Sequence, residues 1–210
     1  MTTNQIALSF AFTDVIFILT LLFSFIGFSS SRIFEWFAFI PFRVVFLREY
    51  WRLFSHALIH QNIFHLFLNA FILLLFGREV EAYYHNQSDN GFLYPLLYLT
   101  AIPVSVAFRG FKSKTDKDYR AVGSSGGVSA IIFSYIAIHP QQVFTVELFY
   151  PISIPGLWLG VAYLLYSLVM FRKGKDTIGH DAHLFGALWG YLFTTAIFPS
   201  LWPLLLEAFF

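Results

Sequence analysis

The chain has 210 residues, of which 58% are hydrophobic, 12% are charged and 28 are phenylalanine. Soluble domains average about 25% charged residues, so this composition predicts a membrane protein. The net charge of +1 gives no indication of nucleic-acid binding. The sequence contains no cysteine, which excludes disulfides and a thiol nucleophile. The length suits one domain, residues 1–210, rather than two.

Apolar stretches, taken in chain order, predict six membrane-spanning helices, because a helix needs about 20 residues to cross ~30 Å of hydrocarbon. They lie at 6–28, 63–83, 92–109, 125–138, 156–171 and 182–199. The first lacks the positively charged start of a secretory signal, so we interpret it as a spanning helix. Residues 29–62 mix aromatic side chains with arginines, which is typical of a segment in the headgroup plane. The predicted fold class is therefore all-α, a polytopic bundle of six helices in the lipid bilayer.

The fourth stretch, 125–138, is shorter than a full crossing. At about 1.5 Å per residue it spans roughly 21 Å. If its far end reaches the opposite interface, Ser125 at its start lies below the near surface. A serine at that depth needs a water-filled cavity, which indicates hydrolytic chemistry inside a membrane.

Polar groups occur at the start of three predicted helices, where lipid makes them costly and function is the usual reason for them. In the second helix, Asn62 is the expected N-cap, and His65 and Asn69 share one face. The fourth helix begins in Gly123-Ser124-Ser125-Gly126-Gly127, and the sixth in His180-Asp181-Ala182-His183. Even-numbered helices of a six-helix bundle start on one side of the membrane, so the three groups lie at similar depth.

Small residues predict that the fourth and sixth helices pack closely. Gly126 and Ala130 are four apart on one helix, and Ala182, Gly186 and Gly190 repeat at the same spacing on the other. Such stripes let two helix backbones approach each other. Ser125 and His183 would then come within hydrogen-bonding reach.

That pairing is the one that nucleophilic catalysis needs. A serine hydroxyl is a weak nucleophile until a neighbouring base takes its proton, and imidazole has a suitable pKa. We therefore predict Ser125 as nucleophile and His183 as general base. The Asn69 amide, the His65 ring and the backbone N–H groups at the start of the fourth helix are candidate oxyanion donors. Glycines beside Ser125 would let a substrate backbone come near.

Three motifs together resemble the rhomboid family of intramembrane serine proteases, in its minimal bacterial six-helix form. They are Trp51-Arg52-Leu53-Phe54-Ser55-His56-Ala57-Leu58-Ile59-His60 followed by His65 and Asn69, then Gly123-Ser124-Ser125-Gly126, then Ala182-His183-Leu184-Phe185-Gly186. Their order and spacing match the family over nearly the whole chain.

The resemblance implies a Ser125–His183 dyad without a third acid, a cofactor or a metal. It implies an oxyanion hole of His65, Asn69 and the Ser125 backbone N–H. Gly123, Gly126, Gly186 and Gly190 would support the site, and Arg52 and Glu81 would be structural polar anchors. The implied substrates are single-pass or polytopic membrane proteins, and the implied location is a cell membrane, the bacterial inner membrane.

Two features depart from the family pattern. Many members have a tyrosine packing on the base four residues after the nucleophile, where this chain has Ser129. Another residue must orient His183, and Tyr135 and Trp189 are candidates. In addition, the connections on the active-site side are rich in Arg and Lys, so the positive-inside rule predicts a cytoplasmic mouth. Simple bacterial rhomboids are expected to have the mouth outside, and we keep this family orientation as the expectation.

Two other functions are compatible with the sequence. A catalytically inactive rhomboid relative would bind membrane proteins without cutting them. A metal or proton transporter would use His56, His60, His65 and His180 as its path. We favour structural hydrogen bonding for His56 and His60, and a loop position for His180. Asp181 and His183 are two residues apart, so on a helix their side chains point about 160° away from each other, and we do not expect Asp181 to orient that ring.

Overall fold

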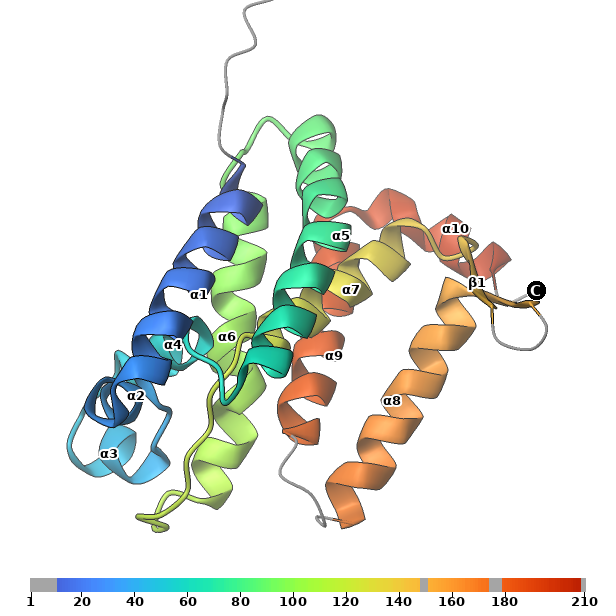
Figure 1. Ribbon diagram of the computed structural model, residues 1–210. Coiled ribbons are helices and arrows are strands. Elements are labelled where there is room, and N and C mark those ends of the chain that lie inside the picture. The colour runs from blue at the N-terminus through green and yellow to red at the C-terminus, as the bar shows by residue number, and fades with distance from the viewer. Residues whose placement is uncertain (1–10, 148–150, 174–178, 209–210) are drawn as a thin grey trace, which may run out of the picture.

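The computed structural model describes residues 11–147, 151–173 and 179–208, and the described chain is mostly helical (Figure 1). The long helices are α1 (Phe12–Ser29), α5 (Ile63–Gln87), α6 (Leu93–Lys112), α7 (Ser125–Ile138), α8 (Gly156–Lys173) and α9 (His180–Ile197). Each corresponds to one predicted span. The first part of the predicted span 6–28 lies outside the described residues.

Three of these helices, α1, α5 and α6, are long and apolar enough to cross a membrane. A fourth crossing results if α9 is taken together with the bent segment Pro199–Ala208, which turns by 101° from it. The short α7 has 14 residues. The described chain therefore has three to four candidate spans, and the predicted count of six is not confirmed.

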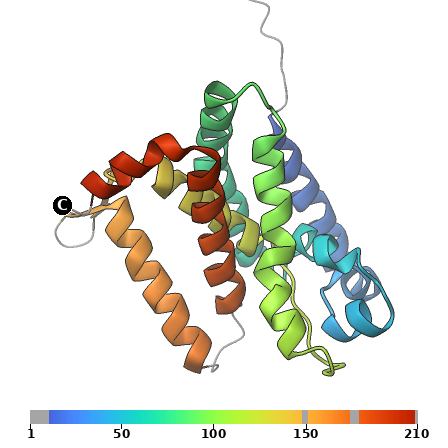
Figure 2. The ribbon, with the colours of Figure 1, turned by 180° about the vertical axis from the view of Figure 1, so that it is seen from behind.

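The α7 helix is the centre of the bundle. All of its residues except Ser125 and Ile132 are buried, and it packs against α5, α6, α8 and α9. Seen from behind, α9 lies between α6 and α8 (Figure 2), which agrees with its packing contacts. Because α7 is enclosed by other helices, the depth of Ser125 is set by protein packing.

The small residues of α7 and α9 allow the close approach that their spacing predicts. A Cβ atom on Gly186 would lie inside contact distance of the Gly126 backbone carbonyl. A Cβ atom on Gly190 would likewise meet the Ala130 carbonyl. The backbones of the two helices therefore touch over more than one turn.

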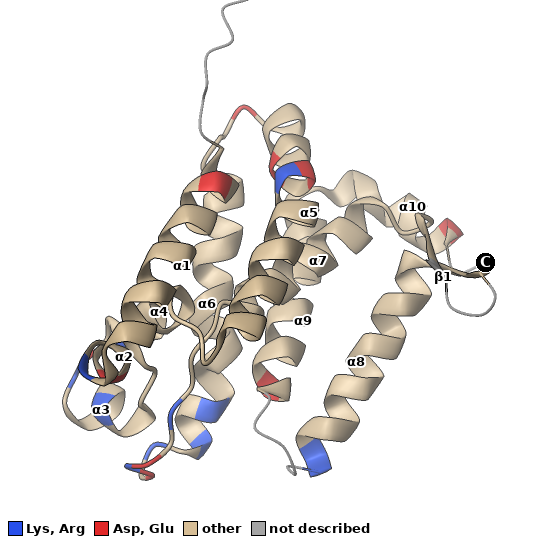
Figure 3. Cartoon of the chain, viewed as in Figure 1, with Lys and Arg blue, Asp and Glu red and all other residues tan. Residues whose placement is uncertain are grey.

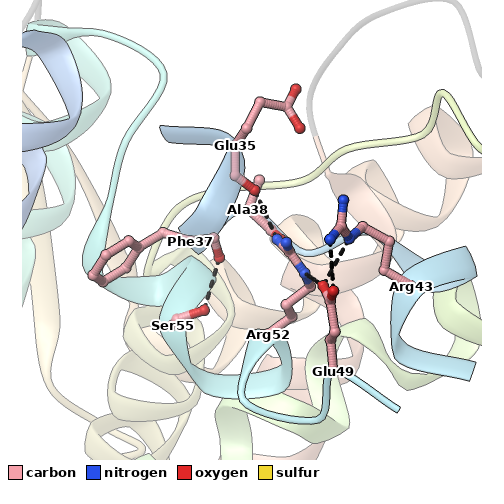
Figure 4. Close-up of polar contacts among 7 residues, drawn as sticks. All are labelled: Glu35, Phe37, Ala38, Arg43, Glu49, Arg52 and Ser55. Atoms are coloured by element: carbon pink, nitrogen blue, oxygen red, sulfur yellow. Dashed lines mark hydrogen bonds and ion pairs between the residues drawn. The ribbon is translucent and has the colours of Figure 1, made fainter. Parts of the chain in front are cut away.

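The segment 29–62 folds as short helices: α2 (Ser31–Phe37), α3 (Pro41–Phe46), α4 (Arg52–Ser55) and the 3₁₀ turn η1 (His56–Leu58). Arg52 holds this segment together, because its side chain is 2% exposed and donates to the Glu35 and Ala38 carbonyls at 2.7 and 2.6 Å (Figure 4). It also pairs with Glu49 at 2.5 Å. A buried guanidinium is tolerated when its donors are satisfied in this way.

Glu81, the other expected polar anchor, caps α1. Its carboxylate accepts the Phe12 and Thr13 backbone N–H groups at 2.6 and 2.9 Å. These N–H groups lie in the first turn of α1, where backbone N–H groups have no acceptor within the helix. The contact therefore joins α5 to α1.

Two parts of the fold were not expected from the sequence. An antiparallel hairpin of β1 (Val143–Glu147) and β2 (Pro151–Pro155) follows α7, with Val143 opposite Pro155. The described chain ends in η2 (Pro199–Leu201) and α10 (Trp202–Glu207), which lie near the hairpin in Figure 1. Both lie at the far end of α7 from Ser125.

Candidate active site

Ser125 is the first residue of α7, and a turn that contains a glycine with positive φ leads into it. Gly123 has φ of 116°, a conformation that L side chains rarely adopt. A Cβ atom at Gly123 would also lie 2.6 Å from Cε1 of His65. The glycine therefore allows both the turn before the nucleophile candidate and the close approach of the His65 ring.

The 29–62 segment holds this turn in place. The Gly123 N–H donates to the His56 carbonyl at 2.9 Å, and Phe39 pairs with Ala121. The Ser124 N–H donates to Nε2 of His60 at 3.3 Å. The turn that carries Ser125 is thus fixed by backbone groups and by one buried histidine.

The tautomer of His60 follows from its partners. Since a backbone N–H can only donate, Nε2 accepts and Nδ1 carries the proton, which it donates to Ser24 Oγ at 3.0 Å. Ser24 in turn donates to the Leu58 carbonyl at 3.2 Å. Burial lowers the pKa of His60 to about 3, so this neutral form persists at physiological pH.

His56 is buried in a similar way. Its Nδ1 donates to the Arg52 carbonyl at 2.9 Å, and burial lowers its pKa to about 4. Both histidines therefore make the structural hydrogen bonds expected of them. Within the described part of the chain, no group of three His, Asp or Glu residues has the arrangement of a metal site.

His183 lies in the first turn of α9. The helix begins at His180, so His180 is a helical residue and the prediction of a loop position was wrong. Asp181 is 2% exposed and pairs with Arg109 of α6 at 2.6 Å. This pair directs the carboxylate toward α6, in agreement with the expectation that Asp181 does not orient His183.

A cavity of about 800 Å³ opens where these segments meet, and Ser125, His183 and His65 all line it. The α7 and α9 starts are adjacent, since a Cβ atom on Gly126 would lie 3.6 Å from the Ala182 carbonyl. Between these described residues, no hydrogen bond joins the Ser125 hydroxyl to His183. Catalytic hydrogen bonds are often long in proteins without substrate and tighten in the complex.

The two side chains predicted as oxyanion donors are placed differently. His65 is half-buried and faces the cavity beside Gly123. The Asn69 side chain is buried, and its amide donates to the His65 backbone carbonyl at 2.9 Å. Asn69 is not among the residues that line the cavity. The cavity therefore brings together Ser125, His183 and His65, whereas the Asn69 side chain lies outside its lining.

The residue that faces the His183 ring is Tyr163 of α8. The two rings are nearly parallel, at 22°, with centroids 6.4 Å apart. The predicted candidates lie elsewhere, since Tyr135 packs on His139 and the Trp189 indole donates to Thr100 at 2.9 Å. Those two predictions were wrong. Nothing in the sequence around Tyr163 indicates a contact with His183, because α8 has apolar and aromatic residues along much of its length.

The chain matches a known protein family. A family model of the rhomboid domain matches residues 47–200, which include Ser125, His183, His65 and Asn69. The chain belongs to the rhomboid family, and it is a multi-pass membrane protein.

One curated relative is a mitochondrial RHOMBOID-like protein 12 of Arabidopsis thaliana. It is 26% identical over 149 residues, which cover 64% of this chain and 43% of the relative. The chain thus spans less than half of the length of this relative. Since the relative is named as mitochondrial, the comparison does not support the bacterial inner membrane that the sequence led us to expect.

Proposed function

We propose that this chain is a serine endopeptidase that cleaves membrane-protein substrates within the bilayer. The observation that carries the proposal is the shared cavity: Ser125 and His183 line it from the first turns of two helices whose backbones touch. Membership of the rhomboid family supports the proposal, because proteins of this family are generally intramembrane serine proteases.

The reaction would use His183 as base and then as acid. His183 takes the proton of the Ser125 hydroxyl while Oγ attacks the carbonyl carbon of the scissile peptide bond. The tetrahedral intermediate collapses as His183 gives that proton to the leaving amine, which leaves an ester on Ser125. A water molecule, deprotonated by His183, then hydrolyses the ester and restores the serine.

The oxyanion would lie at the start of α7. Backbone N–H groups in a first helical turn have no intrahelical acceptor, and they form the positive end of the helix dipole. The His65 ring, which faces the same cavity, supplies a further donor. Asn69 contributes once its amide turns from the His65 carbonyl toward the cavity.

The substrates would be single-pass or polytopic membrane proteins, whose membrane segments would enter the cavity that Ser125 lines. Polar groups that line a cavity at this depth keep water near Ser125, as hydrolysis requires. The proposal needs no cofactor, since a serine and a histidine act with water alone.

The test is labelling of the detergent-purified protein by a fluorophosphonate, alongside Ser125→Ala and His183→Ala. We expect a labelled wild type and the loss of labelling in both variants, because the probe reacts with an activated serine. Labelling that persists in Ser125→Ala would place the reactive group elsewhere and contradict the proposal.

A second candidate is a rhomboid relative that binds membrane proteins without cutting them. The absence of a Ser125–His183 hydrogen bond among the described residues favours it. This candidate predicts a folded wild type that does not label, and binding of a membrane protein that Ser125→Ala leaves unchanged.

A further inference from the structure

The side chain of Tyr163 on α8 lies against the His183 ring. Its phenol ring faces the imidazole at 22°, with a centroid separation of 6.4 Å. Parallel, offset rings at this separation are a favourable aromatic arrangement. The His180 and His183 rings form a T-shaped pair, with centroids 6.1 Å apart and an interplanar angle of 78°, so His180 is not stacked parallel to His183 as Tyr163 is.

Two residues of α7 hold Tyr163 in this position. The Ser129 and Tyr163 hydroxyls lie 3.3 Å apart, and the Phe133 and Tyr163 rings are 5.8 Å apart. Ser129 and Phe133 are four residues apart, so they share one face of α7. The phenol is therefore fixed at its hydroxyl and at its ring by the helix that also begins with Ser125.

Small residues make room for the tyrosine. Ser129 is 3% exposed, and it is the position where the family resemblance led us to expect a tyrosine. On α8, a Cβ atom at Gly160 would lie 3.0 Å from Ile136 and 3.4 Å from Phe133. Because α8 approaches α7 so closely one turn before Tyr163, the phenol reaches the space that a serine at position 129 leaves free.

We propose that Tyr163 is the positioning residue of His183, so that α8 supplies the ring support that α7 lacks. The inference rests on the proposed function, since it assigns Tyr163 a role through the general base. A histidine ring rotates about a broad, roughly two-fold torsion, and a parallel ring on its face restricts that rotation. The nearby carboxylate, Asp181, is engaged by Arg109 and does not provide this restraint.

The test compares Tyr163→Phe, Tyr163→Leu and Tyr163→Met in detergent. The phenylalanine keeps the ring and loses the Ser129 contact, whereas leucine and methionine remove the ring and fill its space. We expect labelling by a fluorophosphonate to slow at least about 10-fold in the leucine and methionine variants, a modest part of the 10²–10⁴-fold range of general-base catalysis. The phenylalanine variant should stay within about 3-fold of the wild type, since it loses one hydroxyl contact.

The matched control is Tyr166→Leu. Tyr166 is on the same helix, is 55% exposed and contacts His180. Its substitution should leave the labelling rate unchanged. If Tyr163→Leu unfolds early on heating, Tyr163→Met carries the comparison, because a flexible thioether adapts to irregular space.

A second readout is specific to the ring. In protein with isotope-labelled histidine, the His183 imidazole resonances should shift in Tyr163→Leu and stay near their wild-type positions in Tyr163→Phe and Tyr166→Leu. A wild type that labels, together with a Tyr163→Leu variant of equal rate and unshifted resonances, would overturn the inference alone. A folded wild type that does not label would overturn the proposed function, and with it a positioning role in catalysis.

Discussion

His60 is the side chain that connects the turn before Ser125 to α1. It is fully buried, and it contacts Ser24 of α1 and Ser124 of the turn through its two ring nitrogens. Neither ring nitrogen faces open solvent, so protonation of the ring would require breaking one of these contacts. The geometry of Ser125 therefore depends on a histidine that stays neutral.

This dependence predicts loss of stability in mild acid. The pKa values of His60 and His56 fall from 6.5 to about 3 and about 4 because the folded protein buries them. The unfolded chain binds more protons below pH 6.5, so the stability present above that pH declines as pH falls toward 4. We expect the thermal unfolding midpoint in detergent to decline over this window, and less steeply in His60→Asn. Equal slopes for the two proteins would contradict this assignment.

His65 lines the cavity and is the proposed side-chain oxyanion donor. Removal of one such donor costs about 10²–10³-fold in kcat in known serine proteases. We predict a loss of about 100-fold for His65→Ala, with little change in KM, from cleavage kinetics in detergent micelles. His85→Ala changes an exposed histidine on the same helix and should behave as the wild type. A His65→Ala variant with full kcat would remove His65 from the oxyanion site.

At the scale of elements, α7 and α9 act as one unit. Their backbones meet at Gly126 and Gly186 and again at Ala130 and Gly190. The Arg109–Asp181 pair at 2.6 Å then fastens the start of α9 to α6. The positions of Ser125 and His183 are therefore set by helix packing over several turns.

This packing makes Gly186 sensitive to a single methyl group. Gly186→Ala would push α9 from α7, and overpacking of a close contact typically costs about 1–3 kcal/mol. We expect a lower thermal midpoint and a loss of fluorophosphonate labelling. The control is Gly27→Ala in α1, where the added Cβ meets Ile59 at an ordinary 3.5 Å. If both variants keep wild-type labelling, the close contact does not position the dyad.

Local signals explain which elements could be predicted. The bounds of α7 match the prediction because glycines and serines precede it and His139 follows it. The Asn62 cap of α5 is also confirmed, as its side chain accepts the His65 N–H at 2.8 Å. The hairpin at 143–155 was missed, since its strands are short and lie between apolar helices.

The parts of the site that the sequence could not predict depend on contacts between distant segments. Arg109 and Asp181 are 72 residues apart, and Ser129 and Tyr163 are 34 apart. The Asn69 amide can point toward the cavity or donate to the His65 backbone carbonyl, and the sequence does not distinguish these two orientations. Motifs thus predicted the residue types of the site, while packing decided their neighbours.

At the scale of the whole molecule, most of the positive charge lies at one end. Figure 3 shows Lys and Arg gathered near α2 and α3 and at the ends of α6 and α8, whereas acidic residues occur at both ends, including the tops of α1 and α5. The cavity with Ser125 includes Arg109 and Arg120, so its mouth is at the basic end. The positive-inside rule predicts that this end faces the cytoplasm, against the family orientation.

The chain has no cysteine, which makes this topology easy to measure. Asp89→Cys and Thr115→Cys place exposed thiols beyond the opposite ends of α6. The vesicles are sealed and right-side-out, from a bacterial host, so a membrane-impermeant maleimide reaches only the face opposite the cytoplasm. We expect it to label Asp89→Cys and not Thr115→Cys. Labelling of both variants in intact vesicles would show that α6 does not cross the membrane. Labelling of Thr115→Cys alone would place the mouth outside, as in simple bacterial rhomboids.

The most direct test of the central claim is hydrolysis of a membrane segment in liposomes. The purified protein is reconstituted with single-span segments that carry glycine or proline near the helix centre, in water enriched in ¹⁸O. We predict a cut peptide whose new carboxylate contains ¹⁸O, with no product from Ser125→Ala or His183→Ala. A folded wild type that yields no product, or a Ser125→Ala variant that yields the same product, would contradict the assignment of Ser125 and His183 as the catalytic pair.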